Sequence, residues 1–249
     1  MSTVLITGCS SGFGLDTARY FLENGWSVIA TMRKPDAALL PSSDQLRILP
    51  LDVSDKASID SAIEATGEID ALVNNAGVGW LSPFEGTSDE NLRRIFETNT
   101  FGLMEMIRGV LPQMRARGAG VIVNVSSSVT LKPLPIASVY TASKAAVNAF
   151  TECLALELAP LGIRSHIVLP GQAPTTSFGK NAMSLMAQSS DTPEDYKDFV
   201  AQIMQAFREP SGKELTKSKS VVEAIWNAVT DSNSPLRIPA GKDAVALAG

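Results

Sequence analysis

The sequence has few of the residues that build disulfide frameworks or metal centres. Its 249 residues include two cysteines, Cys9 and Cys153, and one histidine, His166. Two thiols are too few for a disulfide framework or a thiolate zinc site, and His166 lies in an apolar run, where a structural role is the simpler interpretation. We therefore expect a protein without a bound metal.

Long apolar runs and clusters of basic residues are missing as well. No stretch approaches the roughly 20 apolar residues of a membrane span, and the first residues lack the basic segment and apolar core of a secretion signal. The formal net charge of −5, without a run of Lys and Arg, argues against a nucleic-acid-binding surface. We expect a cytoplasmic protein that binds neither membranes nor nucleic acid.

Apolar residues make up 45% of the chain, which is enough for a large core. Short apolar, β-branched runs alternate with segments of helical periodicity, and no repeat, linker or low-complexity region interrupts them. This alternation predicts one α/β domain over residues 1–249. The expected strands are 3–7, 28–32, 46–51, 71–73, 121–125, 165–169 and 236–239, and the longest expected helices are 89–117, 137–161 and 217–231.

Three glycines, Gly8, Gly12 and Gly14, follow the first expected strand and precede a helical pattern. The order strand, glycine turn, helix presents backbone N–H groups and a helix N-terminus to a pyrophosphate. The same glycines are also compatible with a simple tight turn. Because both flanking elements are present, we favour a dinucleotide-binding turn.

The second expected strand ends before Arg33 and Lys34, where folds that select NAD usually carry an acidic residue for the ribose 2′-hydroxyl. Cations suit the 2′-phosphate of NADP(H) instead, and we favour that cofactor over the alternative of two ordinary surface charges. Asp52, after the third strand, either faces the adenine or caps the next helix.

Tyr140 and Lys144 are four residues apart in an expected helix, so their side chains leave the same face. An ammonium beside a phenol favours the phenolate and lowers its pKa toward the working range of a proton donor or acceptor. Ser127 follows the fifth strand, at the edge where open α/β sheets hold ligands. Alone, the Tyr–Lys pair is more often a solvated surface pair, so the prediction depends on the rest of the chain.

Residues 172–216 differ in character from the rest, with scattered prolines and apolar residues and no clear periodicity. An apolar, irregular insertion of this length predicts a lid over an apolar substrate, with a subunit interface as the alternative.

Six of these elements occur in an order that closely resembles the short-chain dehydrogenase/reductase family over essentially the whole chain. They are Thr7-Gly8-x-x-x-Gly12-x-Gly14, Asn74-Asn75-Ala76-Gly77, Asn99, Ser127, Tyr140-x-x-x-Lys144 and Pro170-Gly171. The resemblance implies a single doubly wound, Rossmann-type domain with about seven parallel strands and helices on both faces. It also implies a homodimer or homotetramer formed through the helices at 89–117 and 137–161.

The resemblance assigns site residues position by position. The expected catalytic residues are Asn99, Ser127, Tyr140 and Lys144. Cofactor binding is expected at Gly8, Ser11, Gly12, Phe13, Gly14, Arg33, Asp52, Val53, Asn74, Ala76, Gly77, Tyr140, Lys144, Pro170, Gly171 and Thr175. The expected substrate pocket contains Trp80, Leu131, Leu134, Phe178 and Met183. Two positions depart from the family pattern: Thr130 stands where many members have Gly, and the run before Thr175 is uncommon.

Taken together, the sequence predicts an NADP(H)-dependent oxidoreductase that interconverts a ketone or aldehyde and an alcohol, on a bulky apolar substrate. One alternative is an NAD-dependent alcohol or diol dehydrogenase that works in oxidation. The other is a nucleotide-binding protein without turnover, which the complete set of four catalytic residues argues against.

Overall fold

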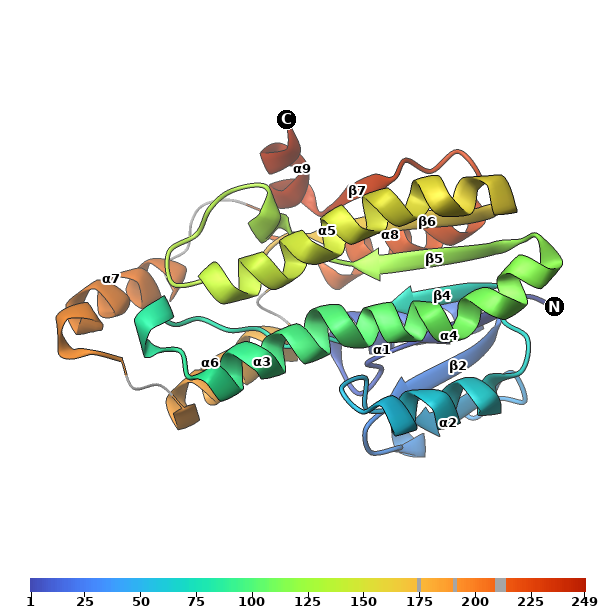
Figure 1. Ribbon diagram of the computed structural model, residues 1–249, viewed down its shortest axis with the longest axis horizontal. Helices are drawn as coiled ribbons and strands as arrows, with labels where there is room; N and C mark the ends of the chain where they lie inside the picture. Colours follow the sequence, from blue (N-terminus) through green and yellow to red (C-terminus); the bar gives the residue numbers. More distant parts are fainter. Residues whose placement is uncertain (174–175, 190–191, 209–213) are drawn as a thin grey trace.

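A computed structural model describes residues 1–173, 176–189, 192–208 and 214–249 of the chain. Its centre is a seven-stranded sheet of order β3-β2-β1-β4-β5-β6-β7, in which every neighbouring pair is parallel (Figure 1). The strands are β1 (Thr3–Ile6), β2 (Ser27–Met32), β3 (Leu46–Pro50), β4 (Ala71–Asn74), β5 (Gly120–Val125), β6 (Ile163–Pro170) and β7 (Arg237–Ala240). The expected doubly wound, seven-stranded fold is therefore confirmed.

The strand order reverses between β1 and β4, which are neighbours in the middle of the sheet. In register, Ile6 of β1 lies between Ala30 of β2 and Val73 of β4. Crossover connections leave this point in opposite directions, so the loops after these strands diverge and open a crevice at the carboxyl edge of the sheet. The order of the strands thus sets the place for a ligand.

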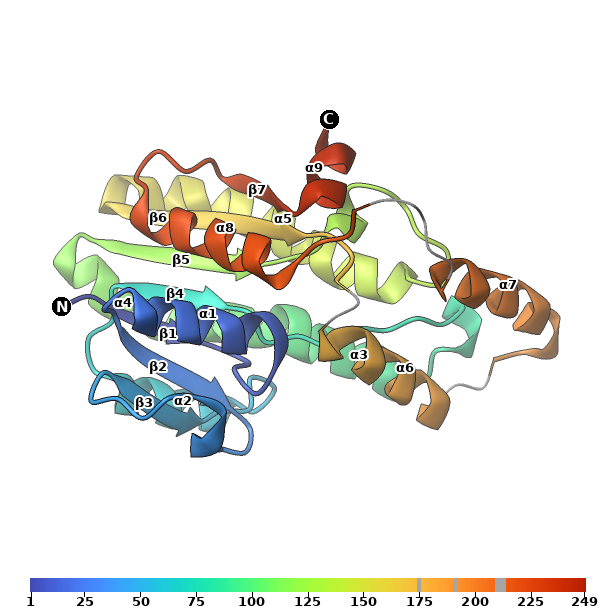
Figure 2. The same ribbon diagram turned by 180° about the vertical axis from the view of Figure 1, so that it is seen from behind.

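Helices cover both faces of the sheet and bury its apolar side chains in two cores. One core includes Phe21 of α1 (Gly12–Glu23) and Ile225 of α8 (Ser218–Thr230), which share a face (Figure 2). The other lies under α2 (Lys56–Thr66), α4 (Gly102–Arg117) and α5 (Ser138–Leu158), and Figure 1 is viewed from that side. Strands covered on both faces require continuous apolar runs, which is the pattern that the sequence shows.

The long helix expected over 89–117 is α3 (Asp89–Phe96) and α4 joined by a π-helical turn, Glu97–Phe101. One extra residue in a helical turn redirects the side chains that follow, and such turns are frequent at functional sites. The turn contains Asn99, which is almost completely buried. Short 3₁₀ turns occur at 37–39, 84–86, 128–130, 159–161 and 194–196.

The insertion, residues 172–216, differs from the irregular segment expected, because it contains two helices, α6 (Ser177–Ser189) and α7 (Lys197–Arg208). Phe178, Ala182 and Leu185 share one face of α6, a spacing that the surrounding prolines and polar residues obscure in the sequence. Both helices lie beyond the carboxyl ends of the strands (Figure 2). The chain ends in α9 (Lys242–Ala248), directly after β7.

In the part of the chain that the structure describes, every helix is too short or too polar to cross a membrane.

Candidate active site

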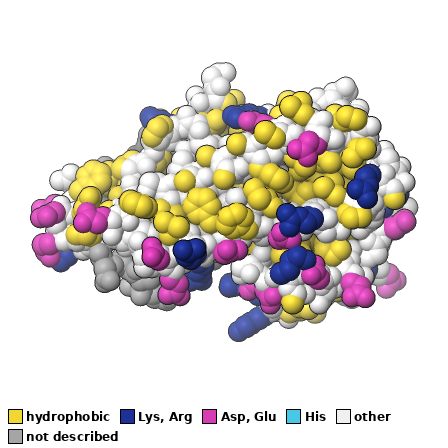
Figure 3. All heavy atoms as spheres, viewed as in Figure 1, with side chains coloured by type: hydrophobic (Ala, Val, Ile, Leu, Met, Phe, Trp, Pro, Cys, Tyr) yellow, Lys and Arg dark blue, Asp and Glu magenta, His cyan; other side chains and the backbone are white. Residues whose placement is uncertain are grey.

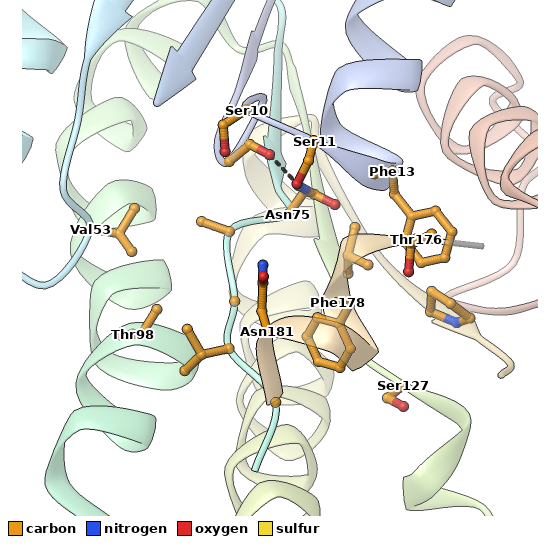
Figure 4. Close-up of a pocket in the computed structure, with 18 of the residues that line it drawn as sticks. Ser10, Ser11, Phe13, Val53, Asn75, Thr98, Ser127, Thr176, Phe178 and Asn181 are labelled. Carbon is orange, nitrogen blue, oxygen red and sulfur yellow. Dashed lines mark hydrogen bonds between the residues drawn. The ribbon is translucent and has the colours of Figure 1, made fainter. Parts of the chain in front are cut away.

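A cavity of about 320 Å³ opens at the carboxyl edge of the sheet. The loops after β1, β2, β3, β4, β5 and β6 form its walls, and α6 closes one side (Figure 4). Of the expected site residues, those that line it are Gly8, Ser11, Gly12, Phe13, Arg33, Asp52, Val53, Ala76, Gly77, Ser127, Tyr140, Lys144, Pro170, Gly171 and Phe178. Residues that are up to 170 positions apart in the sequence therefore meet at one place.

The glycine turn after β1 is shaped by close approaches between backbone segments. Gly8 has φ +76°, and a Cβ at this position would lie 2.8 Å from the Cα of Ala76. At Gly14, a Cβ would overlap the carbonyl oxygen of Gly8 and the side-chain amide of Asn75. Gly14 does not line the cavity, so its role is to let α1 pack against the turn. Only glycine fits at either position.

Asn75 holds the glycine turn against the end of β4. Its side-chain amide donates to the carbonyls of Thr7, at 2.9 Å, and Gly8, at 3.2 Å. The Thr7 hydroxyl in turn accepts from the backbone N–H groups of Asn75 and Ala76, both at 3.0 Å. Asn74 was expected in the site, but strand alternation turns its side chain into the core, where it donates to Asn124.

The N-terminus of α1 faces the cavity with its donors uncapped. Ser11 at the N-cap makes no side-chain capping bond, and the first turn contains no acidic residue. The first N–H groups of a helix carry a partial positive charge and lack intrahelical partners. By contrast, Asp55 caps α2 with its carboxylate. A glycine cradle that ends in free helix donors fits a pyrophosphate, so these residues fit a dinucleotide cofactor.

At the opposite end of the cavity, Asp52 lies near two arginines, Arg33 and Arg94. Asp52 accepts from the backbone N–H of Ser54 at 3.0 Å and from its hydroxyl at 2.6 Å. Partial burial pulls the pKa of Asp52 upward, but the Ser54 hydrogen bonds and the two arginine charges outweigh it, so its pKa lies below the ordinary value. Asp55 rather than Asp52 caps α2, which leaves Asp52 on the cavity wall.

Tyr140 and Lys144, on the first turns of α5, meet Ser127 at the end of β5. The Ser127 hydroxyl lies close enough to Tyr140 to influence its pKa, and the Lys144 ammonium donates to the carbonyl of Val125 at 2.9 Å. Both α5 side chains are buried, with exposed fractions of 7% and 4%. The three groups therefore form one cluster that reaches the cavity, as the spacing predicts.

Burial determines how the Tyr140–Lys144 pair titrates. It raises the pKa of Tyr140 to about 12, although the Ser127 hydroxyl opposes the rise, and it lowers the pKa of Lys144 to about 8. The pKa of Tyr140 therefore lies above its ordinary value and not below it as expected, because burial is the largest contribution. Tyr140 thus keeps its proton at neutral pH, which suits a proton donor.

Asn99 lies behind the cavity wall, where protein groups satisfy its amide. Its Oδ1 accepts from Val78 N at 2.8 Å, and its Nδ2 donates to Val78 O at 2.9 Å and to Ser143 Oγ at 3.1 Å. These bonds fix the segment after β4, including Gly77, whose Cβ would lie 3.5 Å from Lys144 Nζ. Asn99 therefore supports the wall on which Lys144 packs.

Thr130, the departure from the family pattern, closes the turn after Ser127. Its hydroxyl donates to the carbonyl of Ser127 at 2.8 Å and accepts from Asn148 Nδ2 at 3.0 Å. The side chain thus links this turn to α5 and holds Ser127 beside Tyr140.

Most of the expected substrate residues do not line the cavity. Phe178 lines it, and its ring packs against Tyr140. Trp80 is buried in a small core with Tyr140, and its indole N–H donates to Thr87 at 2.9 Å. Leu131, Leu134 and Met183 are not among the lining residues, and the latter two are exposed. Thr175 lies outside the described residues, whereas Thr176 lines the cavity.

Sequence reasoning missed Asn181 and Leu185, which line the cavity from α6, and Arg94, which lines it from α3. Figure 4 shows Asn181 and Phe178 projecting from α6 into the cavity. The spacing of Phe178, Asn181 and Leu185 places them on one helical face, a signal that becomes visible once residues 177–189 are recognised as a helix. No local signal marks Arg94, because its position depends on how α3 packs beside the end of β3.

Comparison with known proteins gives consistent matches. A family model described as short chain dehydrogenase matches residues 2–184. An uncharacterized oxidoreductase of Bacillus subtilis, YusZ, is 36% identical over 96% of this chain and 88% of that protein. The 3-ketodihydrosphingosine reductase of Bacteroides thetaiotaomicron is 34% identical over 96% and 87%. Human retinol dehydrogenase 8 is 36% identical over 94% and 80%.

Solved structures match along nearly the full length. A short-chain dehydrogenase from Streptomyces avermitilis superposes with a TM-score of 0.85 and 35% identity, covering 99% of this chain and 90% of that one. A closed serine dehydrogenase complexed with NADP⁺ gives 0.77 and 30%, over 95% and 92%. A 3-ketoacyl-(acyl-carrier-protein) reductase from Brucella melitensis complexed with NADH gives 0.78 and 28%, over 95% of each chain.

Proposed function

Because the chain belongs to the short-chain dehydrogenase family, we propose that it is an NADP(H)-dependent oxidoreductase that interconverts a ketone or aldehyde and the corresponding alcohol. The observation that carries this proposal is the cluster of Ser127, Tyr140 and Lys144 at the cavity. It combines a hydroxyl donor, a protonated phenol and a cation, the groups that carbonyl reduction needs around the oxygen.

Each side chain has a distinct task in the proposed reaction. The Ser127 hydroxyl donates a hydrogen bond to the carbonyl oxygen, which polarises the carbonyl and stabilises negative charge on that oxygen. The Tyr140 phenol gives its proton to the same oxygen in reduction and takes it back in oxidation. The Lys144 charge stabilises Tyr140 after the proton has left. A bound nicotinamide would supply or accept the hydride.

Arg33 supports the choice of NADP(H). It lines the cavity at the Asp52 end, is exposed, and takes part in no ion pair among the described residues. An exposed guanidinium on the wall suits the 2′-phosphate of NADP(H), because that phosphate carries about two negative charges. Asn75, Gly12 and Phe13 would hold the pyrophosphate end, and Asp52 and Val53 the adenosine end.

The wall contributed by α6 supports an apolar substrate. Phe178 and Leu185 present apolar side chains there, and Asn181 is the polar side chain between them. Apolar walls with a single amide favour a bulky apolar carbonyl compound over a small charged acid. Two relatives are named for a 3-ketodihydrosphingosine and for retinol, which agrees with this proposal. We further propose that the insertion acts as the lid of this cavity.

We also propose a homodimer or homotetramer that uses the α4 and α5 face. Figure 3 shows hydrophobic side chains distributed over this side of the molecule. Leu156 on α5 is 79% exposed and Phe101, next to α4, is 49% exposed. Large apolar side chains exposed together on one face suit contact with a partner, and a second copy of the chain is the economical choice.

The test is a comparison of NADPH and NADH oxidation with a panel of ketones and aldehydes, using wild type, Tyr140→Phe and, as the matched control, Tyr20→Phe. We expect NADPH-selective turnover that falls at least about 100-fold in Tyr140→Phe and is retained in Tyr20→Phe. Tyr20 packs on Trp226, away from the cavity. Equal activity of the two variants would contradict the role of Tyr140. Turnover restricted to NAD⁺ and alcohols would favour the oxidative alternative.

A further inference from the structure

The two ends of the insertion are joined at one point beside the cavity. The backbone N–H of Thr216 donates to the carbonyl of Gln172 at 3.0 Å, so the first residue of the insertion lies next to the last. Gly171 precedes this junction and lines the cavity. Helix α6 begins five residues after the junction and supplies the apolar wall. Whatever fixes the junction therefore affects where that wall stands.

Asp243, in the first turn of α9, binds both ends of the junction with one carboxylate. Its Oδ2 accepts from the backbone N–H of Gln172 at 2.7 Å, and its Oδ1 accepts from the Thr216 hydroxyl at 2.5 Å. The Thr216 hydroxyl also lies 3.1 Å from the carbonyl of Ala240. One hydroxyl proton serves one acceptor at a time, and the shorter, charge-assisted contact identifies Asp243 as that acceptor.

Two glycines make room for this arrangement. A Cβ at Gly171 would overlap the Asp243 carboxylate, and a Cβ at Gly241 would overlap the Thr216 side chain. Thr216 is only 3% exposed, so its hydroxyl depends on protein partners for hydrogen bonds. The residues that directly follow β6 and β7 are thus fitted to Asp243 and to the insertion ends.

We propose that Asp243 is a positioning residue for the reaction, because it fixes the junction of Gln172 and Thr216 and so sets the place of α6 over the cavity. This inference rests on the proposed function. Asp243 touches no reacting atom and acts through the wall that receives the substrate. Its loss should weaken substrate binding more than the chemical step, because Ser127, Tyr140 and Lys144 are held by β5 and α5.

A neighbouring ion pair provides the matched control. Lys242 donates to Glu214 at 2.5 Å, which connects α9 with the same end of the insertion, but both side chains are at least half exposed. Exposed ion pairs contribute little to structure, whereas the partly buried carboxylate of Asp243 satisfies two donors that have no other acceptor as close. Lys242→Ala therefore removes a contact between the same elements without affecting the junction.

The experiment uses the full chain with Asp243→Ala, Asp243→Asn and Lys242→Ala. Amide hydrogen exchange in α6, KM for the carbonyl substrate and kcat are measured, and thermal unfolding verifies that each variant folds. Asp243→Ala should speed exchange in α6 and raise KM, each about tenfold, with kcat within about twofold of wild type. The exchange rate and the KM of Asp243→Asn should lie between those of wild type and Asp243→Ala, because its amide can accept from Gln172 N–H and donate to Thr216 Oγ1. Lys242→Ala should match wild type.

Exchange in α6 needs no substrate, so it tests the role of Asp243 even if the proposed activity fails. Unchanged exchange in Asp243→Ala would overturn the inference, as would an equal change in Lys242→Ala. A lower kcat with unchanged KM would do the same, since it would place Asp243 in the chemical step.

Discussion

The ring of Phe178 lies against the ring of Tyr140, with centroids 5.7 Å apart and planes inclined by 53°. Phe178 comes from α6, whereas Tyr140 belongs to α5 and the catalytic cluster. A Cβ at Gly79 would lie 2.9 Å from the Phe178 ring, so the ring contacts a backbone segment as well as the tyrosine. The insertion therefore contributes to the burial that governs the Tyr140 pKa.

Replacing Phe178 with Ala should expose Tyr140 to water. Because burial is the main cause of the raised pKa, we expect the Tyr140 pKa to fall from about 12 toward its ordinary value of 10. Ultraviolet titration can follow it, since the chain has three tyrosines and Tyr140→Phe identifies the one concerned. KM for an apolar ketone should rise about tenfold. Phe199→Ala is the control, because Phe199 on α7 is 45% exposed and does not line the cavity.

Substitutions at Gly14 and Gly25 distinguish two reasons for a glycine. At Gly14 there is no space for a Cβ, whereas at Gly25 only the positive φ disfavours other residues. Gly14→Ala would place a methyl group against the Gly8 carbonyl and the Asn75 amide, and should lower the free energy of unfolding by about 2–3 kcal/mol and weaken NADPH binding. Gly25 has φ +78° and open space around it, so Gly25→Ala should cost about 1 kcal/mol and leave NADPH binding intact. Urea unfolding and NADPH titration measure both. Equal losses of NADPH affinity would show that the close packing at Gly14 is unimportant.

The sequence predicts the positions of the strands and the cluster of Ser127, Tyr140 and Lys144 because local patterns encode them: buried apolar runs, a glycine turn and a four-residue helical spacing. It does not predict the titration of that cluster, because burial is a property of the assembled fold. Arg94 and Trp80 illustrate the same limit. Arg94 reaches the cavity through the packing of α3, and Trp80, which looked like a pocket residue, is enclosed in a core with Tyr140.

Arg33 and its neighbour Lys34 provide a test of cofactor choice. Arg33→Ala should weaken NADPH binding about 10- to 100-fold, as expected for charge-assisted hydrogen bonds to a phosphate, and change NADH binding little. Lys34→Ala should have a small effect, because Lys34 is exposed and does not line the cavity. Direct titration with both nucleotides gives the affinities without turnover. An unchanged ratio of NADPH to NADH affinity in Arg33→Ala would remove the case for NADP(H).

Leu156 tests the proposed oligomer. Leu156→Glu should shift the protein to a smaller species in sedimentation, because it places a charge in an apolar interface, while thermal unfolding shows a folded chain. The control is Phe84→Glu, at a side chain that is 66% exposed but lies in the 3₁₀ turn at 84–86. The α5 interface would be refuted by a monomeric wild type or by an unchanged mass of Leu156→Glu.

Lys144, which the proposed function requires, should lower the stability of the fold. Burial lowers its folded-state pKa to about 8, whereas the unfolded value is 10.5, so between these values the unfolded chain binds more protons and stability increases with pH. Below pH 8 the fold carries the whole cost of the buried ammonium. Lys144→Met should therefore raise the free energy of unfolding at pH 7 by up to about 3 kcal/mol, less the lost hydrogen bond to Val125, while abolishing turnover.

The pH dependence distinguishes this charge effect from packing. The stability difference between Lys144→Met and wild type should shrink as the pH rises from 8 to 10.5, because wild type loses the penalised charge in that window. Urea unfolding of both proteins from pH 7 to pH 10 measures the difference, and groups common to both cancel. A stability difference that stays constant from pH 7 to pH 10 would mean that folding does not lower the pKa of Lys144.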